Sequence, residues 1–250
     1  MILKKRRIDL VVTHMIDMEK ILIVIPARGG SKRLPRKNVL PLAGKPMISW
    51  TIESAIGANL DSSIIVTSDD EEILNIVKVY CNAGVIAYKR PCELATDTAS
   101  TLDVVVDACN YSVSNGFIPN VVVVLQPTSP LRESIDIKNA MEIYRRSNRK
   151  NTVVSMCEID HPTAWIGYIS EVGEVQNIDF TGKRSQDYQK EYRLNGAIYI
   201  FGYEVLNSEK TIFTEKCLAY VMPKNRSIDV DDKFDFEVAG LFKKLSKGNL

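Results

Sequence analysis

Residues 21–38 read ILIVIPARGGSKRLPRKN, an uninterrupted apolar run that ends in a loop rich in glycine and positive charge. The run shows no polar alternation, which is typical of a central parallel strand covered on both faces. Pro26 interrupts the ladder of hydrogen bonds where the chain must turn. Ligands of open α/β sheets bind at the carboxyl ends of the strands. The stretch therefore predicts a buried strand at 21–25 followed by a ligand-binding loop.

The composition of this loop indicates that its ligand is a phosphate. Two adjacent glycines, Gly29 and Gly30, let backbone N–H groups approach an anion closely. Neither the G-x-x-x-x-G-K-[ST] pattern nor the G-x-G-x-x-G pattern occurs, which argues against a P-loop ATPase and a Rossmann dehydrogenase. A basic surface loop without a ligand is the competing interpretation. The cations available to hold a triphosphate are Arg28, Lys32, Arg33, Arg36 and Lys37.

Composition excludes several other classes of protein. A chain of 250 residues with 45% hydrophobic and 25% charged residues fits one α/β domain with an insertion. A net charge of +1 argues against a general nucleic-acid binder, and we expect no membrane partner. Five scattered cysteines without a C-x-x-C pair favour a reducing cytoplasm. With only two histidines, H-E-x-x-H zinc chemistry is excluded, so a metal ion must bind carboxylates.

The first 17 residues differ from the rest of the chain. The basic run KKRR at 4–7 precedes an apolar stretch that Asp9 interrupts, so it resembles a signal peptide only loosely. Met18 reads like a natural start of the chain. We therefore predict that residues 1–17 are an N-terminal extension that the fold does not need, with a nuclear-type basic signal as the alternative.

Beyond the basic loop, apolar patterns alternate between helix and strand periods. This repetition predicts an α/β fold, a doubly wound and mostly parallel sheet. Residues 161–193 break the pattern with glycines and polar residues, which indicates an irregular arm. We predict helices at 47–58, 71–81, 101–114, 134–146 and 233–247, and strands at 63–67, 84–88, 121–125, 152–157, 196–201 and 217–222.

Two further loops carry polar residues next to predicted elements. The apolar strand at 121–125 is followed by QPTSPLR, and the stretch RPCELATDTAST at 90–101 precedes a predicted helix. Asp97 or Thr98 is an alternative N-cap of that helix, and the loop after 125 is alternatively a polar turn that caps the next helix. The side chains that we expect over the same sheet edge after 125 are Gln126, Thr128, Ser129 and Arg132.

The stretch SIDVDD at 227–232 supplies acidic groups. Side chains alternate along an extended segment, so Asp229 and Asp231 point to one face. Magnesium is usually bound by one or two carboxylates together with substrate phosphates. We therefore predict that this pair holds Mg²⁺, whereas Asp232 fits the cap of the following helix better.

Five segments in order resemble the CMP-sialic acid synthetases, or N-acylneuraminate cytidylyltransferases, a family that includes the CMP-legionaminic and CMP-pseudaminic acid synthetases. The resemblance begins near residue 20 and reaches the end of the chain. It implies one cytidylyltransferase domain at 18–250 with a nucleotide-diphospho-sugar transferase fold and an irregular, β-rich dimerisation arm at about 161–193. The segments are ARGGSKxxPxKN at 27–38, RPxELAxDTAS at 90–100, LQPTSPLR at 125–132, RxNGAIY at 193–199 and IDxD at 228–231.

The resemblance implies transfer of CMP from CTP to the anomeric hydroxyl of a nine-carbon 2-keto sugar acid, with release of pyrophosphate and no covalent intermediate. Asp229 and Asp231 would carry Mg²⁺, and the implied catalytic residues are Lys37, Arg28 and Asp231. We expect Lys32, Arg33 and Arg36 to lie in solvent or on the outer rim of the loop. The implied nucleotide-binding residues are Ala27, Arg28, Gly29, Ser31, Lys37, Asn38, Arg90, Ala99, Ser100 and Thr101.

The same resemblance suggests a sugar site. Its implied residues are Gln126, Arg184, Arg193, Asn195 and Tyr199, with the arginines binding the carboxylate. The spacing from Arg184 to Arg193 is one residue longer than in sialic acid enzymes, and a strand tyrosine such as Tyr199 can equally be core. Ala164 stands near the place of a family lysine and Trp165 is apolar, which favours a less hydroxylated legionaminic or pseudaminic acid over N-acetylneuraminate.

The implied partners are CTP, a nonulosonic acid and a second copy of the chain, because family members dimerise through the arm. In such a dimer Arg184 would serve either its own pocket or that of the second copy.

Two other classes of protein stay open from the sequence. A sugar-1-phosphate nucleotidyltransferase shares the fold but has no need of a paired-arginine carboxylate site. A catalytically inactive sugar-nucleotide-binding module would lack a metal aspartate or the loop lysine, and this chain has both.

Overall fold

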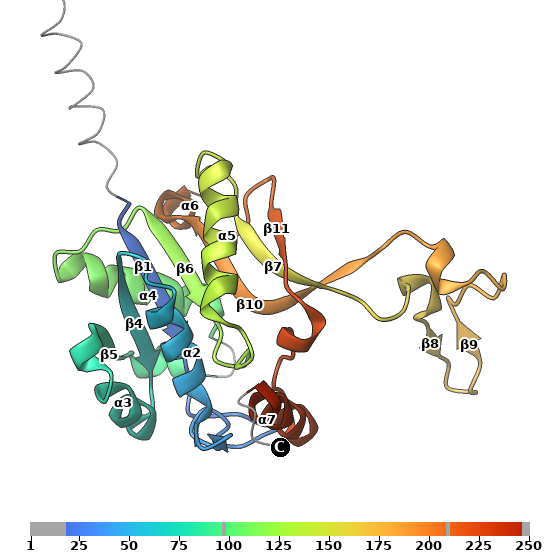
Figure 1. The fold of residues 1–250 in the computed structure, drawn as a ribbon, viewed down its shortest axis with the longest axis horizontal. Helices are drawn as coiled ribbons and strands as arrows, with labels where there is room; N and C mark the ends of the chain where they lie inside the picture. Colours follow the sequence, from blue (N-terminus) through green and yellow to red (C-terminus); the bar gives the residue numbers. More distant parts are fainter. Residues whose placement is uncertain (1–18, 97–98, 209–210, 247–250) are drawn as a thin grey trace, which may run out of the picture.

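A computed structural model describes residues 19–96, 99–208 and 211–246 of the chain. A seven-stranded sheet crosses it in the order β11-β7-β10-β6-β1-β4-β5 (Figure 1). Every neighbouring pair is parallel except the two pairs that involve β10, which confirms the predicted doubly wound and mostly parallel sheet. The strands are β1 (Ile21–Pro26), β4 (Ser62–Ser68), β5 (Val85–Lys89), β6 (Val121–Leu125), β7 (Val153–Glu158), β10 (Tyr192–Gly202) and β11 (Leu218–Val221).

Helices cover both faces of this sheet. Side chains of α2 (Met47–Gly57), α3 (Glu71–Lys78) and α5 (Ser134–Arg146) pack in one apolar cluster. Those of α4 (Thr101–Ser114) and α6 (Tyr203–Ser208) pack in a second cluster on the opposite face. The last described helix, α7 (Lys233–Ser246), contributes to a third, smaller cluster.

The apolar sequence of β1 follows directly from this layering. Ile23 and Ile25 belong to the cluster under α2, α3 and α5, whereas Leu22 and Val24 belong to the cluster under α4. Because both faces are covered, neither set of side chains reaches water. A polar residue at any of these positions would lose its hydrogen bonds to water, which explains the lack of alternation.

Strand β10 is longer than predicted and runs against both neighbours, a direction that the prediction of a mostly parallel sheet left open. It pairs antiparallel with both β6 and β7 and begins at Tyr192, before the predicted start at residue 196. The chain leaves β7 at the carboxyl edge of the sheet and returns to that edge, so the next strand must run backwards. The pairing register with β7 shifts between Leu194 and Tyr199, and Gly196 lies in this irregularity with φ +72°.

The arm at 161–191 projects away from the sheet (Figure 1). It contains the short hairpin of β8 (Tyr168–Ile169) and β9 (Val175–Gln176), and its base is closed by a hydrogen bond from the Ile159 N–H to the Glu191 carbonyl (3.1 Å). The predicted irregular arm is therefore present, but its strands are limited to this short hairpin.

Helix boundaries agree with the predictions to within a few residues. Helix α3 ends at Lys78 rather than 81 because a 3₁₀ turn, η1 (Cys81–Ala83), follows it, and α6 was not predicted. The N-cap of α4 is Ser100, whose side chain accepts from the Asp103 N–H, while Asp97 and Thr98, named above as alternative caps, lie outside the described residues. Residues 1–17 and the predicted helix end at 247 also lie outside them.

A buried ion pair joins the start of α5 to the segment after β11. Asp136 is fully buried and accepts from the Arg226 guanidinium at 2.8 and 2.9 Å and from the Tyr220 hydroxyl at 2.8 Å. This contact holds the chain that leads toward Asp229 against the sheet. Within the described ranges, none of the helices combines the length and the apolar character needed to cross a membrane.

Candidate active site

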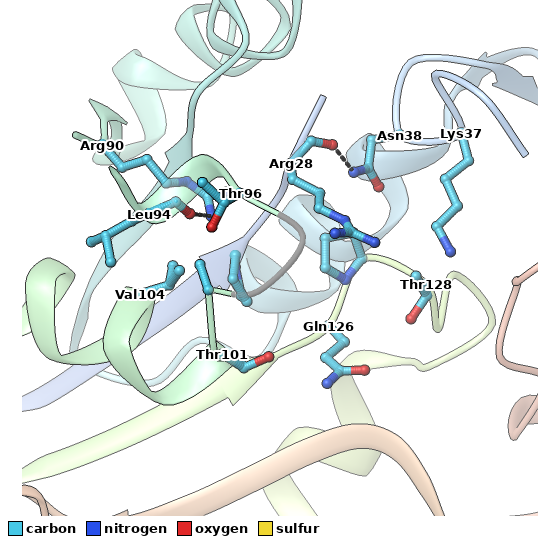
Figure 2. A pocket seen from close by; sticks show the side chains of 13 residues that line it. Arg28, Lys37, Asn38, Arg90, Leu94, Thr96, Thr101, Val104, Gln126 and Thr128 are labelled. Atoms are coloured by element: carbon cyan, nitrogen blue, oxygen red, sulfur yellow. Dashed lines mark hydrogen bonds between the residues drawn. The ribbon is translucent and has the colours of Figure 1, made fainter. Parts of the chain in front are cut away.

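A pocket of about 320 Å³ opens at the carboxyl edge of the sheet, beside the junction of β1 and β6 where the strand order reverses. Figure 2 shows Arg28 and Lys37 extending from the loop after β1 toward Gln126 and Thr128 of the loop after β6. Thr128, expected over this sheet edge, lines the pocket. The residues assigned to the nucleotide or the sugar that line it are Arg28, Lys37, Asn38, Arg90, Ala99, Thr101 and Gln126.

The basic loop is fixed at both ends by backbone carbonyls. The Thr67 carbonyl at the end of β4 accepts from the Ala27 N–H (2.9 Å) and from the Arg90 guanidinium (2.8 Å). Near the other end of the loop, the buried Asn38 amide donates to the Arg28 carbonyl (2.9 Å). Ala27 and Asn38 thus shape the loop, and of the two only Asn38 lines the pocket.

Glycine is required at position 29 because the backbone there lies close to Asp70, which follows β4. A Cβ atom at this position would lie 2.6 Å from Asp70 Oδ2, which is too close for any side chain. Its N–H group donates to Asp69 Oδ1 (3.2 Å). Gly30 has open space around it, so the two glycines have different roles. Ser31 is half-buried and does not belong to the pocket lining.

Lys37 connects the basic loop to the acidic stretch. Its Nζ atom donates to the Val230 carbonyl (2.7 Å) and pairs with Asp231 Oδ1 (3.3 Å). Arg33, expected in solvent or on the outer rim of the loop, has an exposed side chain that donates to Asp231 Oδ2 (2.8 Å). Both oxygens of Asp231 are therefore engaged by loop cations.

Arg36 was expected in solvent or on the outer rim of the loop, and it lies outside the pocket lining with a partly exposed side chain. Its guanidinium donates to both oxygens of Asp70 and to Glu72 at the start of α3. The residue is half-buried and has φ +63°. Its contacts lie within the chain and away from the pocket lining.

Arg90 forms the opposite wall of the pocket. Only 5% of the residue is exposed, and burial lowers the pKa of its guanidinium. It donates to the Thr67 and Leu94 carbonyls, while its Nε has no hydrogen-bond partner among the described residues. The Arg90 Nη2 atom lies 4.0 Å from Asp69 Oδ1. A buried cation with a spare donor is suited to an acceptor group on a ligand.

Asp229 lies near Gln126 and the glycine in β10. A Cβ atom on Gly196 would lie 2.9 Å from Gln126 Oε1 and 3.8 Å from Asp229 Oδ2, so glycine is needed for both its φ and its space. Burial raises the pKa of the Asp229 carboxyl, and a hydrogen bond from Thr128 opposes this shift. Asp229 Oδ1 is buried and has no hydrogen-bond partner among the described residues.

This oxygen fits a hard cation. The described residues contain no group of three or more histidine, cysteine, aspartate or glutamate side chains placed to hold a metal ion. A cation bound at Asp229 and Asp231 would therefore need further oxygen ligands from a substrate, which matches the coordination that magnesium prefers. The donor set is compatible with the predicted Mg²⁺.

The predicted sugar-site residues do not gather in one place. Tyr199 lines an apolar hollow of about 140 Å³ that shares Thr101 and Gln126 with the main pocket, and it packs edge-on against Phe213. Arg193 lines a separate hollow with His161 and Trp165 at the base of the arm.

Arg184 and Asn195 are used by contacts within the chain. Arg184 lies in the projecting arm and pairs with Asp187 (3.2 Å). Asn195 is 1% exposed, donates to Ser227 Oγ (3.0 Å) and accepts from Ser155 Oγ (2.6 Å). This arrangement gives Asn195 a structural role, and its predicted contact with a sugar finds no support in it.

Four other predicted polar residues also have structural positions. Arg132 was expected over the sheet edge with Ser129, but both are buried, and Arg132 donates to the Gln126 (3.1 Å) and Ala197 (2.8 Å) carbonyls. Ser100 caps α4, and Asp232 caps α7 by accepting from the Asp235 N–H (3.0 Å), as predicted for Asp232.

Sequence reasoning missed several groups at the site. Asp69 and Asp70 follow a buried strand, so the rule that identified the other loops applies to them too. The apolar lining residues give no comparable signal, because apolar side chains line pockets and cores alike. They are Pro26, Leu94, Val104 and Pro127.

Comparisons with known proteins agree with this geometry. The sequence profile of the family described as "Cytidylyltransferase" matches residues 22–212. The chain is 36% identical over 222 residues to the N-acylneuraminate cytidylyltransferase of Escherichia coli O18:K1:H7, covering 88% of this chain and 51% of that protein. It is 33% identical over 229 residues to the pseudaminic acid cytidylyltransferase of Campylobacter jejuni, covering 91% of this chain and 97% of that protein.

The chain thus spans about half the length of the N-acylneuraminate cytidylyltransferases that it matches. Among solved structures, it is similar to CMP:2-keto-3-deoxy-manno-octonic acid synthetase complexed with CTP, with a TM-score of 0.68 and 18% identity. The alignment covers 91% of this chain and 100% of that one. At this identity the likeness supports the fold alone.

Gly29→Ala should weaken binding of inorganic tripolyphosphate at least about tenfold, because the new Cβ displaces the loop from Asp70. Gly30→Ala is the matched control and should change the affinity less than about twofold, since open space surrounds that position. Isothermal titration calorimetry measures both. Equal affinities for the two variants would contradict the assigned role of Gly29.

Proposed function

Because the chain belongs to the cytidylyltransferase family, we propose that it transfers CMP from CTP to the anomeric hydroxyl of a nine-carbon 2-keto sugar acid and releases pyrophosphate. One observation carries this proposal: the basic loop, the buried Arg90 and the unpaired oxygen of Asp229 converge on one edge of the sheet, beside an apolar hollow. The relatives named as cytidylyltransferases for nonulosonic acids support the same activity.

The nucleotide side of the pocket supplies positive charge from two directions. Arg28 and Lys37 enter from the loop after β1, and Arg90 enters from the end of β5. Donors fixed before the substrate binds are the main means by which enzymes stabilise charge that develops on phosphoryl oxygens. We assign Arg28 and Lys37 to the triphosphate and Arg90 to the base and ribose.

The reaction forms a bond between the anomeric oxygen and the α-phosphorus and breaks the bond from that phosphorus to the leaving pyrophosphate. Lys37 is held by the Val230 carbonyl and Asp231, so its ammonium lies between the basic loop and the acidic stretch. Mg²⁺ held by Asp229 and Asp231 would neutralise charge on the phosphates when bound. With both Asp231 oxygens engaged, Asp229 Oδ1 is the carboxylate oxygen of the pair still open to a cation or a proton.

The proposed sugar side combines polar and apolar side chains from several segments of the chain. Gln126 lies between the main pocket and the hollow lined by Tyr199, Ile212 and Phe213, which suits an amide with its acyl methyl group. Arg193 shares its hollow with Trp165, so a carboxylate bound there would have an apolar neighbour. This surrounding favours the less hydroxylated legionaminic and pseudaminic acids over N-acetylneuraminate.

We extend the proposal to a homodimer formed through the arm. The arm exposes a series of apolar side chains although it extends from the body of the molecule (Figure 1). Exposed apolar surface of this kind marks interaction sites. The exposed arm residues include Ile166, Tyr168, Ile169, Val172, Val175 and Phe180.

We also propose a cytoplasmic location. The five cysteines are unpaired, which is consistent with a reducing cytoplasm.

The substrate is tested by measuring pyrophosphate release from CTP with N-acetylneuraminate, legionaminic acid and pseudaminic acid. We expect turnover with at least one acid and the highest kcat/KM with a less hydroxylated one. UTP, dTTP and sugar 1-phosphates serve as comparison substrates. Preference for a sugar 1-phosphate would refute the proposed reaction, and preference for N-acetylneuraminate would remove the role given to Trp165.

Lys37→Ala should lower kcat about 100-fold, because it removes a donor aimed at charge that develops in the transition state. The KM for CTP should change less than about fivefold. Lys89→Ala is the control, since Lys89 is exposed and pairs with Glu71 away from the pocket. Steady-state kinetics separates the two parameters, and a change in KM alone would make Lys37 a binding residue only.

Ile169→Asp should convert the dimer to a monomer, because it places a charge on an arm residue that is 78% exposed in the single chain. Sedimentation velocity at micromolar concentration gives the oligomeric state. Val79→Asp provides the control, as Val79 is similarly exposed at the end of α3. A fully active wild-type monomer would rule out an arm-mediated dimer as a requirement.

A further inference from the structure

Arg36 adopts a backbone conformation that an arginine rarely takes. Its φ of +63° lies in the left-handed region, which glycine enters without steric cost. A residue with a side chain persists there only when its surroundings hold it. The guanidinium of Arg36 is bound by Asp70 and Glu72, which supply that hold.

Asp70 is the common partner of several segments. Its Oδ1 accepts from the N–H groups of Glu72 and Ile73 at 3.0 Å each and so caps α3. Its Oδ2 accepts from Arg36 and also lies against Gly29 at the start of the loop. The hydrogen bond from Arg36 lowers the pKa of the Asp70 carboxyl. One carboxylate therefore binds one limb of the loop to a helix end through Arg36 and packs closely against the other limb at Gly29.

The two residues that follow Arg36 belong to the pocket lining. Lys37 reaches the Val230 carbonyl and Asp231, and Asn38 donates to the Arg28 carbonyl. Because these residues are adjacent in the chain, the backbone angle at Arg36 determines the direction in which Lys37 leaves the loop. A change at Arg36 would displace groups that touch the substrate.

We infer that Asp70, which lies outside the pocket lining, is a positioning residue of the active site: by holding Arg36 in its left-handed conformation, it orients Lys37 and Asn38 toward the substrate. We call this contact the Arg36–Asp70 clamp. The effect of the clamp on turnover rests on the proposed function, whereas its effect on the loop can be measured without any substrate.

The test compares Asp70→Asn, Arg36→Ala and the double variant. An asparagine at position 70 keeps an acceptor for the cap of α3 but removes the charge that binds Arg36. Each single change should speed hydrogen exchange of the amides at 28–40 about tenfold in the free protein, and should lower kcat/KM for CTP about tenfold with most of the loss in kcat. The double variant should be no worse than the more impaired single variant, because both single changes already remove the Arg36–Asp70 contact.

Arg36→Gly separates the backbone from the side chain. This variant loses the clamp, but glycine adopts the required φ without cost, so it should retain about fivefold more activity than Arg36→Ala. Glu71→Gln is the matched control, because it removes an exposed ion pair with Lys89 from the same helix turn and should change kcat/KM less than about twofold.

Two results would overturn the clamp. One is an unchanged rate of amide hydrogen exchange at 28–40 in both single variants. The other is a loss of kcat/KM in the double variant that equals the sum of the two single losses, expressed as free energies. A general loss of stability is recognised by a matching fall in thermal midpoint and by faster exchange throughout the sheet, and this result too would count against a positioning role. If the wild-type protein turns over no sugar acid, the proposed function fails, while the exchange data still decide the clamp.

Discussion

Five cations within ten residues repel one another, so the loop after β1 holds one conformation only because acidic groups and carbonyls surround it. Asp69 and Asp70 approach it from the end of β4, and Asp231 approaches from the segment before α7. The loop is thereby ordered by contacts within the chain. A phosphate of the proposed substrate would therefore meet groups that are already arranged, and little binding energy would be lost in ordering them.

The parallel sheet brings these groups together although they are distant in the sequence. The loops after β1, β4, β5 and β6 all leave the same edge, and the reversal of strand order between β1 and β6 leaves room for a pocket there. The apolar interior of the sheet is thus the support for a polar site. Residues such as Arg132 and Asn195 link the two regions, because their polar groups bind buried carbonyl or hydroxyl groups beneath the pocket.

Much of this arrangement could be predicted from the sequence, because buried parallel strands and the loops after them carry strong patterns. The residues at 21–25 and 121–125 could be placed in the sheet for that reason, and seven of the predicted site residues line one pocket. The direction of β10 could not be predicted, since it depends on where the arm returns the chain. Side-chain partners were also beyond reach: Arg36 and Arg132 look alike as isolated cations, yet one clamps a loop and the other is buried.

The antiparallel course of β10 has a consequence for how such a protein can evolve. The arm leaves from the end of β7 and returns to the start of β10, and a backbone hydrogen bond between Ile159 and Glu191 closes its base. Insertions, deletions or exchanges beyond that closure need not alter the pairing of any strand in the main sheet. The arm can therefore diversify while the main sheet and the pocket at its carboxyl edge are inherited unchanged, which separates selection for new contacts of the arm from selection for a stable fold.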